Sequence, residues 1–192
     1  MPSANFRTGL ATYATSISAQ TRSVTTTFFH HTSMLNATLA VRELEASGFT
    51  HMVWVPDSFL GPWESALLAS HQLKLIRPCR EGEAIGIAAG LMLGGARPLV
   101  VMQCTGMFEA GDALRNVVHD LKLPLKLIVG VRSYQAFLDG KSKDNCAVFT
   151  APILQAWKMP FTLVSHPDDA NFAESVRKLA GSIEADALLL GE

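Results

Sequence analysis

The sequence predicts an α/β domain built on a doubly wound, mostly parallel sheet with helices on both faces. Short apolar runs rich in Val, Ile and Leu alternate along the chain with longer amphipathic or alanine-rich segments. Strands that are apolar at every position are typical of parallel sheets covered on both faces. Their alternation with helices indicates repeated strand–helix–strand units joined by right-handed crossovers.

The expected elements follow one another from residue 34 onward. The first helix begins there and ends at Gly48, a residue that commonly stops helices. Apolar runs predict strands at 52–55, 73–76, 98–102, 125–131, 161–164 and 187–190. The remaining helices are expected at 63–70, 80–94, 109–121, 151–158 and 168–182.

Composition divides the chain into two parts. Residues 1–33 are rich in Ser and Thr and contain no acidic residue, since the first carboxylate of the chain is Glu43. We expect a disordered extension there, with an Arg-bearing transit peptide as the alternative. Residues 34–192 are long enough to bury the core of one domain.

Charge and cysteine content exclude several classes of protein. The chain has 16 Lys and Arg against 17 Asp and Glu. It therefore lacks the excess of basic residues with which proteins bind nucleic acids or anionic membranes. The apolar run 125–131 is too short to span a bilayer. Neither the 3 cysteines nor the 6 histidines show the spacing of a disulfide framework or a metal site. We therefore expect a cytoplasmic protein that binds small molecules or other proteins and holds no metal by itself.

The segment 80–94 is the most unusual stretch of the sequence. Its glycines recur at every fourth position, so on a helix they form one nearly bare face. A glycine inside a helix costs roughly 1 kcal/mol relative to alanine, which indicates that something approaches this face closely. A sheet, a partner helix or a ligand would each serve, and Glu81 and Glu83 suit the positive N-terminus of the helix.

Working residues in such sheets lie on loops beyond the carboxyl ends of the strands. Asp57 and Ser58 follow the first strand, where they either cap the next helix or face a ligand. Gln103, Thr105 and Gly106 belong to a polar turn after a buried strand, in a loop expected at 103–109. A second loop is expected at 132–150.

Cations also fall at this predicted edge. Arg77, Arg80 and Arg132 follow strands there, and each is either a surface charge or part of a site for an anionic substrate.

These motifs resemble a known family. Glu81 and the run Gly-Glu-Ala-Ile-Gly-Ile-Ala-Ala-Gly after it are similar to the helix of the pyrimidine-binding (Pyr) domain of thiamine diphosphate enzymes. The segments 55–58, 101–106 and 130–132 resemble, in the same order, segments of sulfopyruvate and phosphonopyruvate decarboxylases. The resemblance covers residues 34–190.

The resemblance implies a role for each of these residues. Glu81 would be the catalytic glutamate, which shares a proton with N1′ of the aminopyrimidine. Gln103, Thr105 and Gly106 would lie on the cofactor side. The residues on the substrate side would be Asp57, Ser58, Arg80, Arg132 and Lys143, and the substrate an anionic 2-oxo acid. The identity of that acid, and whether an aldehyde or a carboligation product forms, stay open.

The sequence departs from the family pattern in two ways. Cys104-Thr105 and Arg132-Ser133 stand where the decarboxylases usually have Asn-Ser and Arg-Gly, and Lys143 stands where a histidine is expected. The family also binds Mg²⁺ and the diphosphate through a Gly-Asp-Gly motif, which this sequence lacks. The resemblance therefore implies the alpha subunit of a hetero-oligomer, with Pyr–Pyr or Pyr–diphosphate-domain contacts, whose beta subunit carries Mg²⁺. A regulatory Pyr-like module and another doubly wound nucleotide-binding enzyme are the alternatives.

Overall fold

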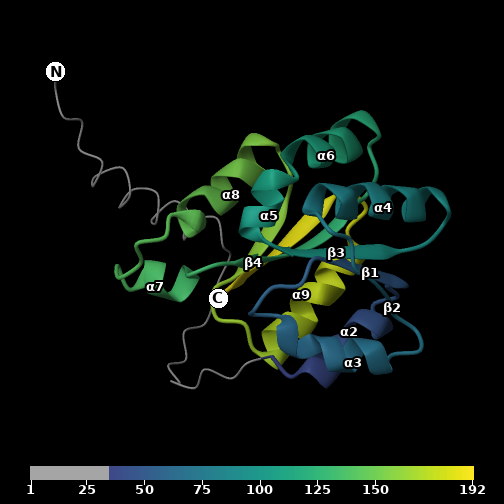
Figure 1. The fold of residues 1–192 in the computed structure, drawn as a ribbon, viewed down its shortest axis with the longest axis horizontal. Helices are drawn as coiled ribbons and strands as arrows, with labels where there is room; N and C mark the ends of the chain where they lie inside the picture. The colour runs from purple at the N-terminus through teal and green to yellow at the C-terminus, as the bar shows by residue number, and fades with distance from the viewer. Residues whose placement is uncertain (1–34) are drawn as a thin grey trace. The chain divides into compact units, whose positions relative to one another are not determined.

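The computed structural model describes residues 35–192, so the extension expected at 1–33 lies outside the described residues. The strands form one six-stranded, entirely parallel sheet in the order β2-β1-β3-β4-β6-β5 (Figure 1). They are β1 (His51–Trp54), β2 (Lys74–Ile76), β3 (Pro98–Gln103), β4 (Lys126–Val131), β5 (Phe161–Val164) and β6 (Asp186–Gly191). The predicted fold class is confirmed.

Helices connect the strands and cover both faces of the sheet. They are α2 (Ala37–Ala46), the 3₁₀ turn η1 (Gly61–Trp63), α3 (Glu64–Ala69), α4 (Glu81–Leu93), α5 (Cys104–Glu109), α6 (Gly111–Arg115), the π-helical turn η2 (Asn116–Asp120), α7 (Tyr134–Leu138), α8 (Cys146–Ala156) and α9 (Asp169–Gly181). Two predictions were wrong here. The loops expected at 103–109 and 132–150 contain α5, α7 and the first turns of α8.

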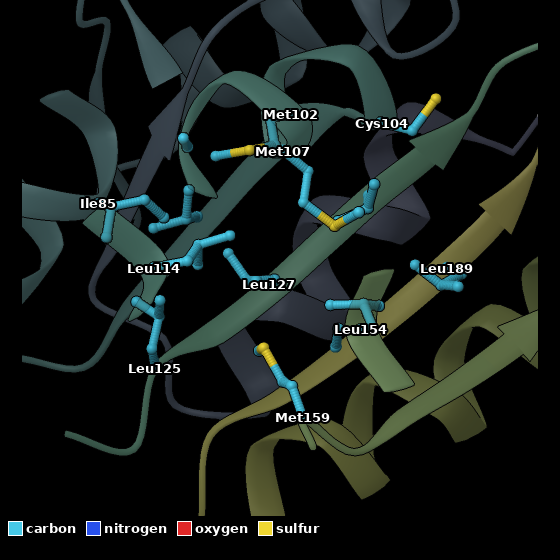
Figure 2. Packing of buried hydrophobic residues seen from close by; sticks show 14 of the residues in the cluster. Ile85, Met102, Cys104, Met107, Leu114, Leu125, Leu127, Leu154, Met159 and Leu189 are labelled. Carbon is cyan, nitrogen blue, oxygen red and sulfur yellow. The ribbon is translucent and has the colours of Figure 1, made fainter. Parts of the chain in front are cut away.

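The core lies in two layers, one on each face of the sheet. Alternate residues of one strand contribute to opposite layers, as Val100 and Met102 do on one side of β3 and Leu99 and Val101 on the other. The first layer packs the sheet against α4, α5, α6 and α8, and Figure 2 shows side chains of this layer, Ile85 among them. The second packs it against α2, α3 and α9, which lie together on the other side in Figure 1.

Local signals fix where helices begin and end. Asn36 caps α2, since its side chain accepts a hydrogen bond from the backbone N–H of Leu39 at 3.1 Å. Gly48 has φ +80° and follows α2, as expected of a residue that stops a helix. Leu39 itself is 44% exposed, while Ala40, Val41 and Leu44 form the buried face of this helix.

The order of the strands contains a switch point between β1 and β3. The chain passes from β1 to β2 on one side of β1 and returns to β3 on the other. Connections that leave in opposite directions open a crevice at the carboxyl ends of the two strands, and ligands bind there in sheets of this kind. Among residues 35–192, no helix has the length and apolar character needed to cross a membrane.

Candidate active site

Glu81 is the first residue of α4, which begins where the chain leaves an extended conformation at Arg80 (φ −144°, ψ 151°). Two carboxylates satisfy backbone donors around this start. Glu83 Oε2 accepts a hydrogen bond from Cys79 N at 2.9 Å, and Glu109 Oε2 accepts one from Gly82 N at 3.2 Å. Glu81 is therefore held at a helix start that other acidic side chains stabilise, and its own carboxylate is not needed as a cap.

Gly106 of α5 makes room for the Glu81 side chain. A Cβ added at Gly106 would lie within 3.0 Å of the Cγ, Cδ and Oε1 atoms of Glu81, closer than real Cβ contacts come. Only glycine therefore lets the carboxylate occupy this place. Two residues 25 positions apart in sequence, both expected at the site, lie in contact.

Gln103 ends β3 and Thr105 lies in the first turn of α5, not in the polar turn expected there. Thr105 Oγ1 donates a hydrogen bond to Gln103 Oε1 at 3.3 Å, so the two polar side chains are linked. Between them, Cys104 is fully buried in the core layer and is labelled in Figure 2. The helix forms because Cys104, Gly106 and Met107 bury one side of it.

Asp57 acts first as a cap. Its Oδ1 accepts hydrogen bonds from the backbone N–H groups of Phe59 and Leu60, both at 2.8 Å. Its Oδ2 is buried and has no hydrogen-bond partner among the described residues. Burial raises the pKa of this carboxyl, while the two backbone hydrogen bonds lower it. Ser58 beside it is exposed.

The structure pairs the candidate arginines with carboxylates. Arg80 donates to Glu109 and Arg132 Nε donates to Asp144 Oδ2 at 2.6 Å. Hydrogen bonds from Cys146 and from Arg132 hold the pKa of Asp144 below its usual range. The structure thus brings none of these guanidinium groups forward as an unpaired charge.

Two further cations were expected at this edge. Arg77, a third arginine there, forms an ion pair with Glu64 at 2.8 Å. Lys143 is exposed, and none of the ion pairs within residues 35–192 involves it.

Ser133 adopts a backbone conformation that favours glycine. Its φ of +60° lies in the left-handed region, directly before α7. The decarboxylase pattern has glycine here, so the local geometry expected of that glycine is present although the residue is serine. A serine in this region costs roughly 1 kcal/mol or more.

Glu192 follows β6 and was not among the expected site residues. Its Oε2 accepts a hydrogen bond from Gln103 Nε2 at 3.3 Å, and its Oε1 is buried with no partner in the described part of the chain. Burial raises the pKa of this carboxyl to about 7, and the nearby charge of Asp57 adds to the effect. The rule that selected the other residues, a place beyond the carboxyl end of a strand, would also have found this one.

No group of three or more His, Cys, Asp or Glu side chains within residues 35–192 is arranged to hold a metal ion.

Similar proteins were found by sequence and by structure. The phosphonopyruvate decarboxylase of Streptomyces viridochromogenes is 25% identical over 136 residues, which are 71% of this chain and 34% of that protein. The sulfopyruvate decarboxylase subunit alpha of Methanococcus maripaludis is 27% identical over 141 residues, 71% of this chain and 81% of that one. It spans about a third of the length of the Streptomyces relatives, which match over 34% of their own sequences.

The fold comparison agrees with the sequence comparison. A thiamine diphosphate-dependent 4-hydroxybenzoylformate decarboxylase from Rhodococcus jostii superposes with a TM-score of 0.58 at 17% identity, over 81% of this chain and 29% of that one. At this identity the likeness concerns the fold. No family model matches the chain. The resemblance to Pyr domains of thiamine diphosphate-dependent decarboxylases, predicted from the glutamate helix, is confirmed.

Proposed function

We propose that this chain supplies the Pyr half of a thiamine diphosphate-dependent decarboxylase that acts on an anionic 2-oxo acid of the sulfopyruvate or phosphonopyruvate kind. The names of the similar proteins support the reaction, and the parallel sheet with its switch point supports the place of the site.

The observation that carries the proposal is the seat of Glu81 against Gly106. A carboxylate at the start of a helix, in a space that only glycine leaves open, suits a group that must meet a ring nitrogen at short range. The neighbouring Gln103 and Thr105 add an amide and a hydroxyl with spare hydrogen-bonding capacity. These residues fit the pyrimidine end of the cofactor.

The described residues do not fit the other end. They include no cluster of metal ligands, and the sequence has no Gly-Asp-Gly motif. A diphosphate carries Mg²⁺ in such sites, so we assign Mg²⁺ and the diphosphate to a beta subunit. The similarity to a protein named subunit alpha supports a separate partner chain.

Thiamine diphosphate, when bound, supplies the nucleophilic carbon that attacks the 2-oxo group. The part of Glu81 is to hold a proton between its carboxylate and N1′ of the aminopyrimidine. The half-buried place of Glu81 limits competition from water for that hydrogen bond. We propose that the anionic group of the substrate meets Lys143, or Arg80 or Arg132 after it displaces their carboxylate partners, and that Asp57 and Ser58 line the same edge.

The outer face of α4 suits a partner chain. Gly86 and Gly90 are exposed, and a Cβ added at either would meet nothing within 4 Å, while Leu93 is 73% exposed. The opposite face, with Ala84, Ile85, Ala88 and Ala89, packs on the sheet. Of the three contacts that the sequence left open, the sheet does not meet Gly86 or Gly90, and we assign the close approach that they permit to another chain.

The isolated chain should bind thiamine diphosphate weakly, since it lacks the diphosphate site, and should gain turnover only with a Gly-Asp-Gly-bearing partner and Mg²⁺. Calorimetry measures cofactor binding by the lone chain and by the mixture, and a decarboxylase assay of the same two samples measures turnover. Tight, metal-dependent binding to the lone chain would contradict the division between subunits. A mixture that assembles without turnover would favour the regulatory alternative. The cytoplasmic location stays a prediction.

Glu81→Gln tests the role of the glutamate. The amide is nearly isosteric but cannot share an acidic proton, so the rate of hydrogen–deuterium exchange at C2 of the bound cofactor should fall by about 10²- to 10⁴-fold. Glu83→Gln is the matched control, because that side chain caps Cys79 N and an amide oxygen can do the same. Unchanged exchange in Glu81→Gln would refute the assignment.

A further inference from the structure

The backbone of Glu192 is fixed on two sides. Its N–H donates to Val131 O at 3.2 Å, and its C=O accepts from Gln135 N at 2.9 Å. Gly191 before it is enclosed by Ser165 O and the Tyr134 ring, so that no side chain fits at that position. The direction in which the Glu192 side chain leaves β6 is therefore set by the sheet and by α7.

Gly130 of β4 provides the space that this side chain fills. A Cβ added at Gly130 would overlap Glu192 Oε1, at less than the 3.0 Å that real Cβ atoms keep. Gly130 pairs with Gln103 on one side and with Leu190 on the other. The carboxyl of Glu192 thus reaches across the end of β4 to the last residue of β3.

The hydrogen bond across this space orients an amide of the candidate site. Gln103 Nε2 donates to Glu192 Oε2 at 3.3 Å, and Gln103 Oε1 accepts from Thr105 Oγ1 at 3.3 Å. If the amide were turned around, its oxygen would face a carboxyl oxygen and its nitrogen would face the hydroxyl. A carboxylate opposite an amide nitrogen therefore selects one of the two orientations.

The charged groups that act on Glu192 oppose one another. Asp57, after β1, disfavours the ionised form, whereas Arg132, after β4, and the Gln103 amide favour it. α7 contributes no charged side chain: the Tyr134 ring and the Gln135 amide lie against Gly191, and the Gln135 backbone N–H donates a hydrogen bond to the Glu192 carbonyl. Burial is the largest influence, and the carboxyl ionises with a pKa of about 7.

We propose that Glu192 is a positioning residue of this site, which holds the Gln103 amide in the orientation that presents its Oε1 to Thr105 and its free amide hydrogen to a bound ligand. The inference rests on the proposed function only for the identity of that ligand, the aminopyrimidine side of the cofactor. The contact itself is a property of the chain alone. The ionised carboxyl of Glu192 can only accept, so it selects this orientation, whereas protonation adds an O–H donor and weakens the selection.

The test follows the side-chain amide of Gln103 by ¹⁵N NMR in the full chain without partner or cofactor. The two amide resonances, assigned by their loss in Gln103→Ala, should shift with pH around a midpoint of about 7. In Glu192→Gln, which keeps an acceptor but does not ionise, the resonances should stay near their low-pH positions and cease to titrate. In Glu192→Ala they should move to the values of a solvated amide.

Asp57→Asn provides a second, independent variant. It removes a neighbouring negative charge, so the midpoint seen at Gln103 should move to lower pH. Glu184→Gln is the control, because Glu184 is exposed and should leave the Gln103 titration unchanged.

A Gln103 amide that does not titrate, or that titrates equally in Glu192→Gln, would overturn the proposal whatever the chain catalyses. If the amide responds as expected but the assembled protein has no decarboxylase activity, the positioning role stands and the proposed function fails. For the cofactor, we expect a larger dissociation constant in Glu192→Ala and a dissociation constant near that of the parent in Glu192→Gln.

Discussion

Gly106→Ala tests the position of Glu81 separately from the stability of the fold. The added methyl would come within 3.0 Å of three atoms of Glu81, so the carboxylate has to leave its place. Glu81 is half-buried and stands at the open start of α4, so its side chain can rotate outward without moving the helix. The substitution therefore displaces one functional group and leaves the core unchanged.

Two small effects on stability oppose each other. Alanine in place of glycine inside a helix stabilises by roughly 0.5 to 1 kcal/mol, whereas a displaced or off-rotamer side chain costs roughly 0.5 to 1.5 kcal/mol. The free energy of unfolding should change by less than about 1 kcal/mol, which corresponds to at most about 2 to 4 °C in Tm for a domain of this size. The loss of proton sharing by Glu81 should slow C2 exchange by about 10²- to 10⁴-fold.

Calorimetric unfolding of the lone chain and C2 exchange in the assembled protein measure the two quantities separately. Gly181→Ala is the matched control, because Gly181 ends α9 and an added Cβ there meets nothing within 4 Å. It should leave exchange unchanged. A Gly106→Ala protein that exchanges at the parent rate would show that the seat of Glu81 against Gly106 is not the working position. A loss of more than about 3 kcal/mol, the scale of core disruption, would show that Glu81 cannot rotate away.

Three further perturbations test other parts of the argument. Gly86→Ala and Gly90→Ala should each stabilise the lone chain by about 0.5 to 1 kcal/mol yet weaken assembly with the partner, and sedimentation that shows unchanged assembly would argue against α4 as the contact face. Lys143→Ala should raise KM roughly tenfold to a hundredfold, since a charge-assisted contact is worth about 1.5 to 3 kcal/mol, and a larger rise in Arg132→Ala would instead assign the substrate anion to that guanidinium. Asp144 has a lowered pKa in the folded chain, so its contribution to stability is complete above about pH 4 and is lost as pH falls further. Acid unfolding followed by circular dichroism should therefore begin from a lower stability but depend less on pH in Asp144→Asn.

The strands could be predicted because buried parallel strands are apolar along their whole length. The predicted run 161–164 matches β5 residue for residue, and the other strands differ by a residue or two at their ends. The starts of helices were harder to predict where no capping side chain marks them. Gln103 precedes α5 and Asn145 precedes α8 without a side-chain cap, so the sequence there resembled a loop.

The glycine helix shows what periodicity leaves undecided. Small residues occur on both the alanine face and the glycine face of α4, so their spacing predicted a close contact without indicating which face makes it. The side chains of Ala88 and Ala89 pack on the sheet because they bury apolar surface there, and Gly86 has no side chain to bury.

The sequence could predict on which edge of the sheet the candidate site lies, but not which side chains contact one another there. The rule that working residues follow the carboxyl ends of strands selected Asp57, Gln103 and the start of the glutamate helix, whereas the switch point between β1 and β3 became visible only in the strand order of the structure. The partners that Asp144 and Glu109 provide for the arginines depend on loop geometry between residues 12 and 29 positions apart, which pattern alone does not reveal.

The position of β6 in the sheet governs the order in which the domain can assemble. β6 is last in sequence but lies between β4 and β5, and β5 pairs with β6 alone among the strands. A chain emerging from the ribosome therefore has the apolar edge of β4 and the whole of β5 exposed until residues 186–191 are available. Such unpaired edges are prone to associate with other chains. β4 and β5 therefore depend on β6 for this part of the sheet, and the edge that includes Glu192 forms only when β6 has inserted between them.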